Sequence, residues 1–306
     1  MAESRPQNLL FIFLRLSHPW FVLGGILVYA LGTGVADYLG TTINWNVYLL
    51  GQVWIIAMQL GAAYLYEYYE ALASARDPFH ASPPGGNGRI SPGKHPVTLL
   101  VAVAVCLTAV ATLTALMLRE LSLAPATLAV MALITLGAVA YSVPPVRLAF
   151  SGYGELIVAI LFANLVPAFA FLMQTGDLHR LLAMSTFPLA ALFLALSLAY
   201  ELADYAADLK RGRRTLMVRV GWQRGMGLHN GMILGAFLLL GLALTFGLPL
   251  GIGLPAFLPL PLGLLQIWQM RRISDGAKPN WRALRLSAVV IFATTAYLLT
   301  LAFWTR

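Results

Sequence analysis

Charged side chains are scarce in this sequence. Only 10% of its 306 residues are Asp, Glu, Lys or Arg, whereas 59% are hydrophobic. A soluble domain carries about 25% charged residues. The composition therefore excludes an ordinary soluble domain and indicates a polytopic integral membrane protein.

The sequence also lacks the residues for a disulfide, a Ser/His/Asp catalytic triad or a histidine metal site. Cys106 is the only cysteine and lies in an apolar run, so no intrachain disulfide can form and a buried structural thiol is expected. No Ser/His/Asp arrangement can be recognised. The five histidines lack the spacing of metal ligands: His18, His80, His95, His179 and His229.

Long apolar runs dominate what is present. A membrane-spanning helix needs about 20 such residues, and about nine windows qualify. They predict one all-α transmembrane domain over residues 1–306. The polar Met1–Pro6 segment is too short for a cleavable signal, so the first span is expected to be retained. The windows are Trp20–Ala36, Tyr48–Tyr66, Val97–Leu118, Pro125–Tyr141, Leu156–Met173, Phe187–Tyr200, Met232–Leu248, Gly251–Ile267 and Ala288–Phe303.

The basic residues predict the orientation. With a cytoplasmic N-terminus and nine spans, 17 of the 20 Lys and Arg residues fall on the cytoplasmic side. The other side receives Arg119, Arg180 and Arg306 only. This asymmetry follows the positive-inside rule. The +8 net charge is thus a topology signal and does not require a nucleic-acid partner. The cell inner or plasma membrane is expected if the source is bacterial.

Acidic residues gather where the predicted sixth span ends. Glu201, Asp204 and Asp208 are spaced i, i+3, i+7, which places them on one helix face. Lys210 and three arginines follow at once. An ordinary polar helix end explains the cations, but acids at membrane depth are costly and usually functional. The pattern favours a divalent metal that in turn holds a phosphate.

A second acidic region follows the second span. Glu67 and Glu70 share a helix face, and Asp77 lies further on, before Pro78. The glycine-rich loop after it carries Arg89 and Lys94 and could approach an anion, although flexible linkers look similar. Both acidic regions face the predicted cytoplasmic side, which points to one shared site.

A third cytoplasmic segment runs from Tyr141 to Glu155. It contains Arg147, which could hold a phosphate or simply anchor the loop as a positive-inside residue; both readings stay open. Glu155 enters the next span, where it could form an ion pair or cap the helix.

Three motifs occur together in this sequence. They are Asp204-x-x-x-Asp208-x-x-x-Gly212-x-x-Thr215, Tyr141-Ser-x-x-Pro145 followed by Gly152-x-Gly154-Glu155, and Arg15 followed by Pro19. With these motifs the chain resembles the UbiA-type intramembrane prenyltransferases. The loop Gly85-Gly86-Asn87-Gly88-Arg89-Ile90 is similar to that of the menaquinone branch, the dihydroxynaphthoate polyprenyltransferases.

One motif departs from the family pattern. The first motif of the family reads Asn-Asp-x-x-Asp, whereas this chain has Tyr66-Glu67-Tyr68-Tyr69-Glu70. Both acids are kept as glutamates with longer stems. The asparagine becomes Tyr66, which is a poor Mg²⁺ ligand. This puts the first metal site, and with it the usual substrate, in question.

The resemblance implies a Mg²⁺-dependent transfer of a polyprenyl group from its diphosphate to an aromatic acceptor, in quinone (menaquinone-like) biosynthesis, at the cytoplasmic face of the bilayer. It implies that six acids bind the metal, that four of them (Glu67, Glu70, Asp204 and Asp208) are catalytic, and that several basic or aromatic residues bind the substrate. The acids are Glu67, Glu70, Asp77, Glu201, Asp204 and Asp208, and the substrate-binding residues are Arg15, Arg89, Lys94, Tyr141, Arg147 and Lys210.

Two alternatives remain at this point. The first is the same fold acting on hydroxybenzoate, homogentisate, a haem or a lipid headgroup. The second is a non-catalytic binder or transporter of prenyl diphosphates or lipids, for which the altered first motif is the support.

Overall fold

The computed structural model describes residues 16–76 and 96–306, and every regular element in these ranges is helical. Nine stretches of the described chain are long and apolar enough to cross a membrane, which confirms the predicted all-α polytopic fold. The elements are α2 (Pro19–Tyr38), α3 (Trp45–Arg76), α4 (Pro96–Glu120), α5 (Pro125–Ser142), η3 (Leu148–Phe150), α6 (Gly154–Ile160), η4 (Leu161–Leu165), α7 (Val166–Thr175), α8 (Arg180–Lys210), α9 (Leu216–Val220), α10 (Trp222–Thr245), α11 (Leu250–Gly253), η5 (Pro255–Phe257), α12 (Leu260–Ser274) and α13 (Trp281–Trp304).

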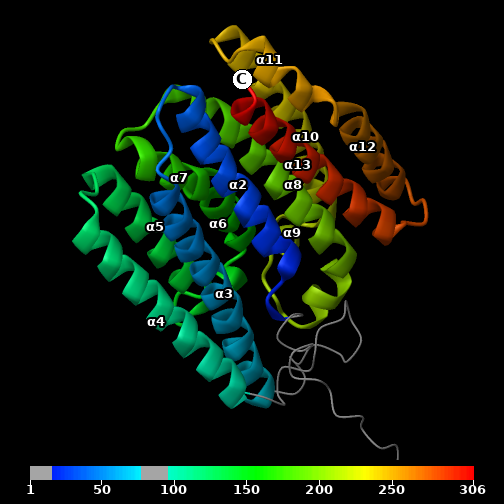
Figure 1. Cartoon of the computed structure of the whole chain (residues 1–306). Coiled ribbons are helices and arrows are strands. Elements are labelled where there is room, and N and C mark those ends of the chain that lie inside the picture. Colours follow the sequence, from blue (N-terminus) through cyan, green and yellow to red (C-terminus); the bar gives the residue numbers. More distant parts are fainter. Residues whose placement is uncertain (1–15, 77–95) are drawn as a thin grey trace, which may run out of the picture.

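The long helices run side by side as one bundle (Figure 1). Helix α8 packs along α10 and α13, α2 packs along α7 and α13, and α3 packs along α4. Short α9 lies at the end of the bundle where α8 finishes, and the C-terminus lies at the other end beside α11 (Figure 1). The first and last transmembrane helices therefore meet, which closes the bundle.

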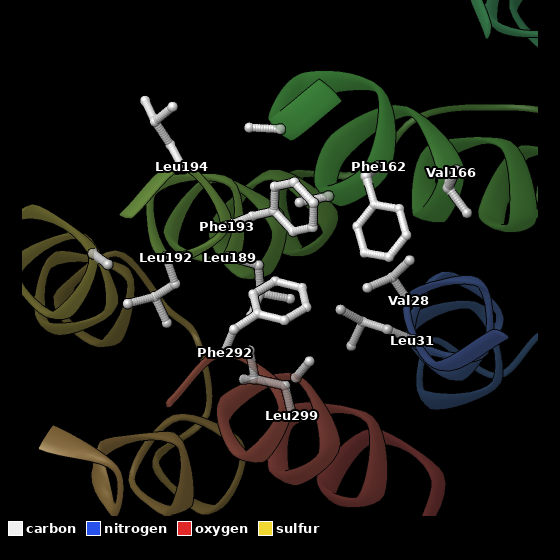
Figure 2. Packing of buried hydrophobic residues seen from close by; sticks show 14 of the residues in the cluster. Val28, Leu31, Phe162, Val166, Leu189, Leu192, Phe193, Leu194, Phe292 and Leu299 are labelled. Carbon is white, nitrogen blue, oxygen red and sulfur yellow. The ribbon is translucent and has the colours of Figure 1, made fainter. Parts of the chain in front are cut away.

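Close packing holds these helices together, as expected where lipid removes most of the hydrophobic drive for association. Figure 2 shows Phe162, Phe193 and Phe292 pointing toward one another from three helices, with ring centroids 4.8 and 5.3 Å apart along the series. At Gly32 a Cβ would lie 2.0 Å from the carbonyl oxygen of Pro167. Glycine at this position lets the backbones of α2 and α7 approach closely.

Helices α3 and α8 are longer than a span requires. They have 32 and 31 residues, or about 45–48 Å at 1.5 Å per residue, against about 30 Å of hydrocarbon. The sequence windows end at Tyr66 and Tyr200, but both helices continue through the acidic residues that follow. The acids thus sit on rigid helix ends.

Two spans are interrupted. The fifth consists of α6, a π-helical turn at η4 and then α7. The eighth breaks into α11, the 3₁₀ turn η5 and α12, at Pro255, Pro259 and Pro261. Proline lacks the N–H that continues the helical ladder and crowds the preceding turn, which explains the break.

The cations separate between the two ends of the bundle as the sequence predicts. Arg147 and Arg285 contact acids on the final turns of α3 and α8. At the opposite end, Arg306 approaches Gly251 and Arg180 approaches Gly247. The acidic helix ends therefore lie at the same end of the bundle as Arg147 and Arg285, and the positive-inside rule predicts that this end faces the cytoplasm.

We expect the C-terminus to lie on the non-cytoplasmic side. A reporter that is active only in the cytoplasm should stay silent when fused after Arg306. The same reporter fused after Gly276, in the exposed connection between α12 and α13, should be active and provides the control. A strong signal from the fusion at Arg306 would contradict the nine-span orientation.

Candidate active site

The final turns of α3 carry the first acidic motif. Glu67 is only 5% exposed, and its Oε1 lies 3.8 Å from Nε2 of His18. Glu70 is the next acid on the same face, and its Oε2 accepts a hydrogen bond of 3.5 Å from Arg147 Nη2. Burial of a carboxylate is costly unless it is paired. Arg147 supplies that partner for Glu70, and the imidazole of His18 lies beside Glu67.

The connection between α5 and α6 supplies Arg147. Its backbone φ is 37°, in the left-handed region that non-glycine residues rarely adopt. The side chain turns inward, so that Cζ lies 4.0 Å from the ring centroid of Phe150. Only 22% of the side chain is exposed. A positive-inside anchor needs neither the strained backbone nor the ion pair with Glu70, so the geometry favours a role in the site.

The second motif lies on the final turns of α8. The Asp208 side chain is 6% exposed, and its Oδ1 lies 3.9 Å from Arg213 Nη1. Asp204 is more open, at 44%, and its Oδ1 accepts a hydrogen bond of 3.1 Å from Arg285 Nη2 on α13. Asp208 is therefore buried and does not lie in solvent at the helix end. Asp204 faces α13 and lines a cavity.

A built loop follows α8. Gly212 has a φ of 64°, which lets the chain reverse directly after the helix. Thr215 Oγ1 then accepts from Val218 N at 3.2 Å and caps α9. The carboxylates of Glu155 and Glu201 accept from Leu216 N and Met217 N at 3.1 and 3.3 Å. These acids anchor the loop on the bundle, as acceptors for otherwise unpaired N–H groups.

This loop directs Arg213 back into the site. Arg213 Nη2 donates to Tyr66 Oη on α3, so one side chain joins the two acidic helix ends. The Tyr66 ring lies 6.2 Å from that of Phe150 and 6.0 Å from that of Tyr141. Burial lowers the pKa of Arg213, but Tyr66, Asp208 and Glu70 outweigh this and hold the pKa above its ordinary value.

A cavity of about 640 Å³ opens beside Asp204. Its lining comes from α8 and from the start of α13 with the connection before it. The residues are Ala203, Asp204, Lys278, Pro279, Asn280, Trp281, Arg282 and Arg285. Three cations and one aromatic ring in the same wall suit an anionic, partly flat ligand.

The structure thus brings together Glu67, Glu70, Tyr141, Arg147 and Asp208, and places Asp204 at the edge of the cavity. Lys210 is exposed on the last turn of α8, and Glu201 is engaged with α9. Four predicted residues lie outside the described residues: Arg15, Asp77, Arg89 and Lys94.

The sequence gives no individual role to Arg213, Arg285 or Phe150. Arg213 belongs to the basic cluster after Asp208 that suits a metal-bound phosphate, Arg285 is predicted only as a positive-inside residue, and Phe150 is one apolar residue among many. For Arg213 the sequence does hold one signal, because Tyr66, its hydrogen-bond partner, replaces the asparagine of the family motif. For Arg285 the sequence holds no such signal, because its partner Asp204 lies 81 positions away.

The acidic residues fit a hard divalent cation. Within residues 16–76 and 96–306 no three His, Cys, Asp or Glu side chains converge on one point. Mg²⁺, however, is usually held by one or two carboxylates together with substrate phosphates, so a pair suffices. Arg147, which pairs with Glu70, and Arg213, which pairs with Asp208, both lie over the ring of Phe150. This places the two motifs around a common region.

A helical membrane bundle with two acidic helix ends and arginines between them suits the binding of a metal and an anionic ligand. The chain belongs to the UbiA prenyltransferase family, whose model matches residues 20–289. Members of this family are prenyltransferases, so the chain is an intramembrane prenyltransferase.

Solved structures share the fold at low identity. The UbiA homologue of Archaeoglobus fulgidus bound to GPP and Mg²⁺ is 16% identical, with a TM-score of 0.63 over 94% of this chain and 99% of that one. The Aeropyrum pernix K1 homologue is 13% identical, with a TM-score of 0.61 over 90% and 96%. A digeranylgeranylglyceryl phosphate synthase is 15% identical, with a TM-score of 0.63 over 96% of both chains. No curated protein sequence matches this chain.

Proposed function

We propose that this protein, as one domain over residues 1–306, transfers a polyprenyl group from its diphosphate to an aromatic acceptor in quinone (menaquinone-like) biosynthesis, with Mg²⁺. The observation that carries the proposal is the meeting of the two acidic helix ends, α3 and α8, around Arg147 and Arg213. Such a group of carboxylates and guanidiniums suits a metal-bound diphosphate. The Archaeoglobus homologue with GPP and Mg²⁺ supports the same chemistry.

The reaction breaks the allylic C–O bond, and the diphosphate leaves with the electron pair. The acceptor ring forms the new bond to the allylic carbon and loses a proton. When bound, Mg²⁺ would act as a Lewis acid that neutralises charge on the leaving group. Water must be kept from the carbon while it is cationic, and the acids Glu67 and Asp208 are both buried at this end of the bundle.

We assign the metal, the diphosphate and the developing cation to different side chains. Glu67, Glu70, Asp204 and Asp208 would hold the metal, with Glu201 and Asp77 as second choices. Arg147 would bind the diphosphate, as would Arg15, Arg89, Lys94 and Lys210. The rings of Tyr66 and Tyr141 would face the developing cation, which aromatic faces stabilise.

The cavity beside Asp204 supports an anionic aromatic acceptor. Lys278, Arg282 and Arg285 could pair with a carboxylate, and Trp281 offers a flat surface. A carboxylated aromatic such as dihydroxynaphthoate has this chemistry, and so has hydroxybenzoate. The menaquinone-like assignment rests on the resemblance of the 85–90 loop.

We expect purified full-length protein to convert prenyl diphosphates when supplied with Mg²⁺ and a carboxylated aromatic acceptor. The assay combines a panel of donors and acceptors, with products identified by mass spectrometry and pyrophosphate release measured in parallel. The expected product has the mass of the acceptor plus the prenyl group less one ring hydrogen, or that mass less CO2 where the acceptor loses its carboxylate. Binding of the donor without its consumption, with every acceptor, would contradict the proposal and favour a non-catalytic binder.

A further inference from the structure

Arg213 occupies an unusual position in the site. Its guanidinium contacts both acidic helix ends, through Tyr66 on α3 and Asp208 on α8. Its guanidinium carbon lies 5.1 Å from the ring centroid of Phe150, the same ring that Arg147 covers at 4.0 Å. Two permanent positive charges therefore lie over one aromatic ring between the two acidic motifs.

Both guanidiniums retain donor capacity. Nε of Arg147 and Nε of Arg213 are buried and have no hydrogen-bond partner among the described residues. A buried donor without a partner is costly, so each is a place where an incoming acceptor gains a strong hydrogen bond. Guanidinium groups match phosphate oxygens in geometry and cannot lose their charge near neutral pH.

Tyr66 explains how Arg213 stays in this position. The residue is a poor metal ligand, but its hydroxyl accepts from Arg213 and its ring packs against Phe150 and Tyr141. Tyr66 therefore ties a cationic side chain to the first acidic motif. The tyrosine that replaces the family's asparagine at position 66 is therefore the hydrogen-bond partner of Arg213.

We propose that Arg213 is a diphosphate-binding cation built into the space between the two acidic helix ends and held there by Tyr66. It supplies part of the positive charge that the leaving diphosphate needs, so that binding of the diphosphate depends less on metal than in a site with acids alone. A fixed guanidinium in a buried site stabilises developing charge without reorganisation. This inference rests on the proposed prenyl transfer, because it assigns a residue to the same site.

Binding of inorganic pyrophosphate to the full-length protein in detergent, with chelator and without metal, tests the inference. We expect the wild type to bind pyrophosphate under these conditions by calorimetry. Arg213→Met should weaken this binding at least about tenfold. Arg213→Lys, which keeps the charge but loses the planar fork, should lie between the two. Tyr66→Phe removes the hydroxyl but keeps the ring, and should weaken binding by about threefold.

Arg214→Met is the matched control, because it removes the same charge one position along from an exposed side chain; its pyrophosphate affinity should equal that of the wild type. A second readout is the Mg²⁺ concentration for half-maximal turnover, which should rise in Arg213→Met. If Arg213 only ties the helices together, Arg213→Met would melt earlier but bind metal-free pyrophosphate as the wild type does.

That result, or no metal-free binding by the wild type, would overturn the inference while prenyl transfer by the wild type still stands. Conversely, metal-free binding that depends on Arg213, in a protein that consumes no donor with any acceptor, would uphold the anion site and overturn the proposed function.

Discussion

Replacing Asp208 with asparagine is expected to lower turnover at least about tenfold, which corresponds to about 1.4 kcal/mol or more in the barrier. The substitution keeps size and shape but removes one negative charge from a side chain that is 6% exposed. A hard cation binds more weakly when an anionic ligand is lost. The diphosphate would then lack part of its counter-charge, and the allylic C–O bond would ionise less readily.

The measurement is turnover against Mg²⁺ concentration for the wild type and Asp208→Asn. Glu120→Gln provides the matched control, because it also removes one carboxylate charge, from a side chain 56% exposed at the other end of the bundle. Equal recovery of folded protein from membranes shows that all three insert normally. Identical Mg²⁺ curves for Asp208→Asn and the wild type would leave the metal–diphosphate assignment without support.

Replacing either Glu67 or Glu70 with alanine is expected to remove most of the activity. Glu67 is buried on the final turns of α3, and Glu70 holds Arg147 at 3.5 Å. Removing one partner of a mostly buried pair leaves the other uncompensated, which costs about 3–5 kcal/mol in fully buried cases. The first motif would then lose both an acid and the orientation of its arginine.

The double variant Glu67→Asp, Glu70→Asp tests the same site with conservative changes and should retain activity. Both carboxylates are kept, and the stems shorten by one methylene to the aspartates of the family pattern. Turnover of the double variant and of each alanine variant is compared at limiting Mg²⁺. Wild-type turnover in both alanine variants would show that the first motif is not a metal site.

The number of spans could be predicted because lipid imposes one length on every apolar run. The ends of α3 and α8 could not, because hydropathy stops at Tyr66 and Tyr200 whereas both helices continue into the polar segment. These extra turns are stabilised by contacts from elsewhere, such as Arg147 on α3 and Arg285 on α8. Such contacts leave no periodic signal in the sequence.

The acids of the candidate site could be found from their spacing, since carboxylates one turn apart share a helix face whatever packs against them. Their partners could not be found in that way. Glu70 and Arg147 are 77 positions apart, and Tyr66 and Arg213 are 147 apart. From the sequence alone, Arg147 is equally consistent with a positive-inside residue that anchors the loop and with a phosphate ligand.

The sequence by itself determined the membrane fold, the separation of charge between its two ends and the family, since these depend on composition and local spacing. Only the tertiary structure decided that Glu155 and Glu201 cap α9, that Asp204 faces α13, and that Arg213 joins Tyr66 to Asp208. The reason is that each of these depends on how a loop leaves its helix and which neighbour it meets. That direction is set by a few backbone angles, such as those of Arg147 and Gly212, and by packing across the whole bundle.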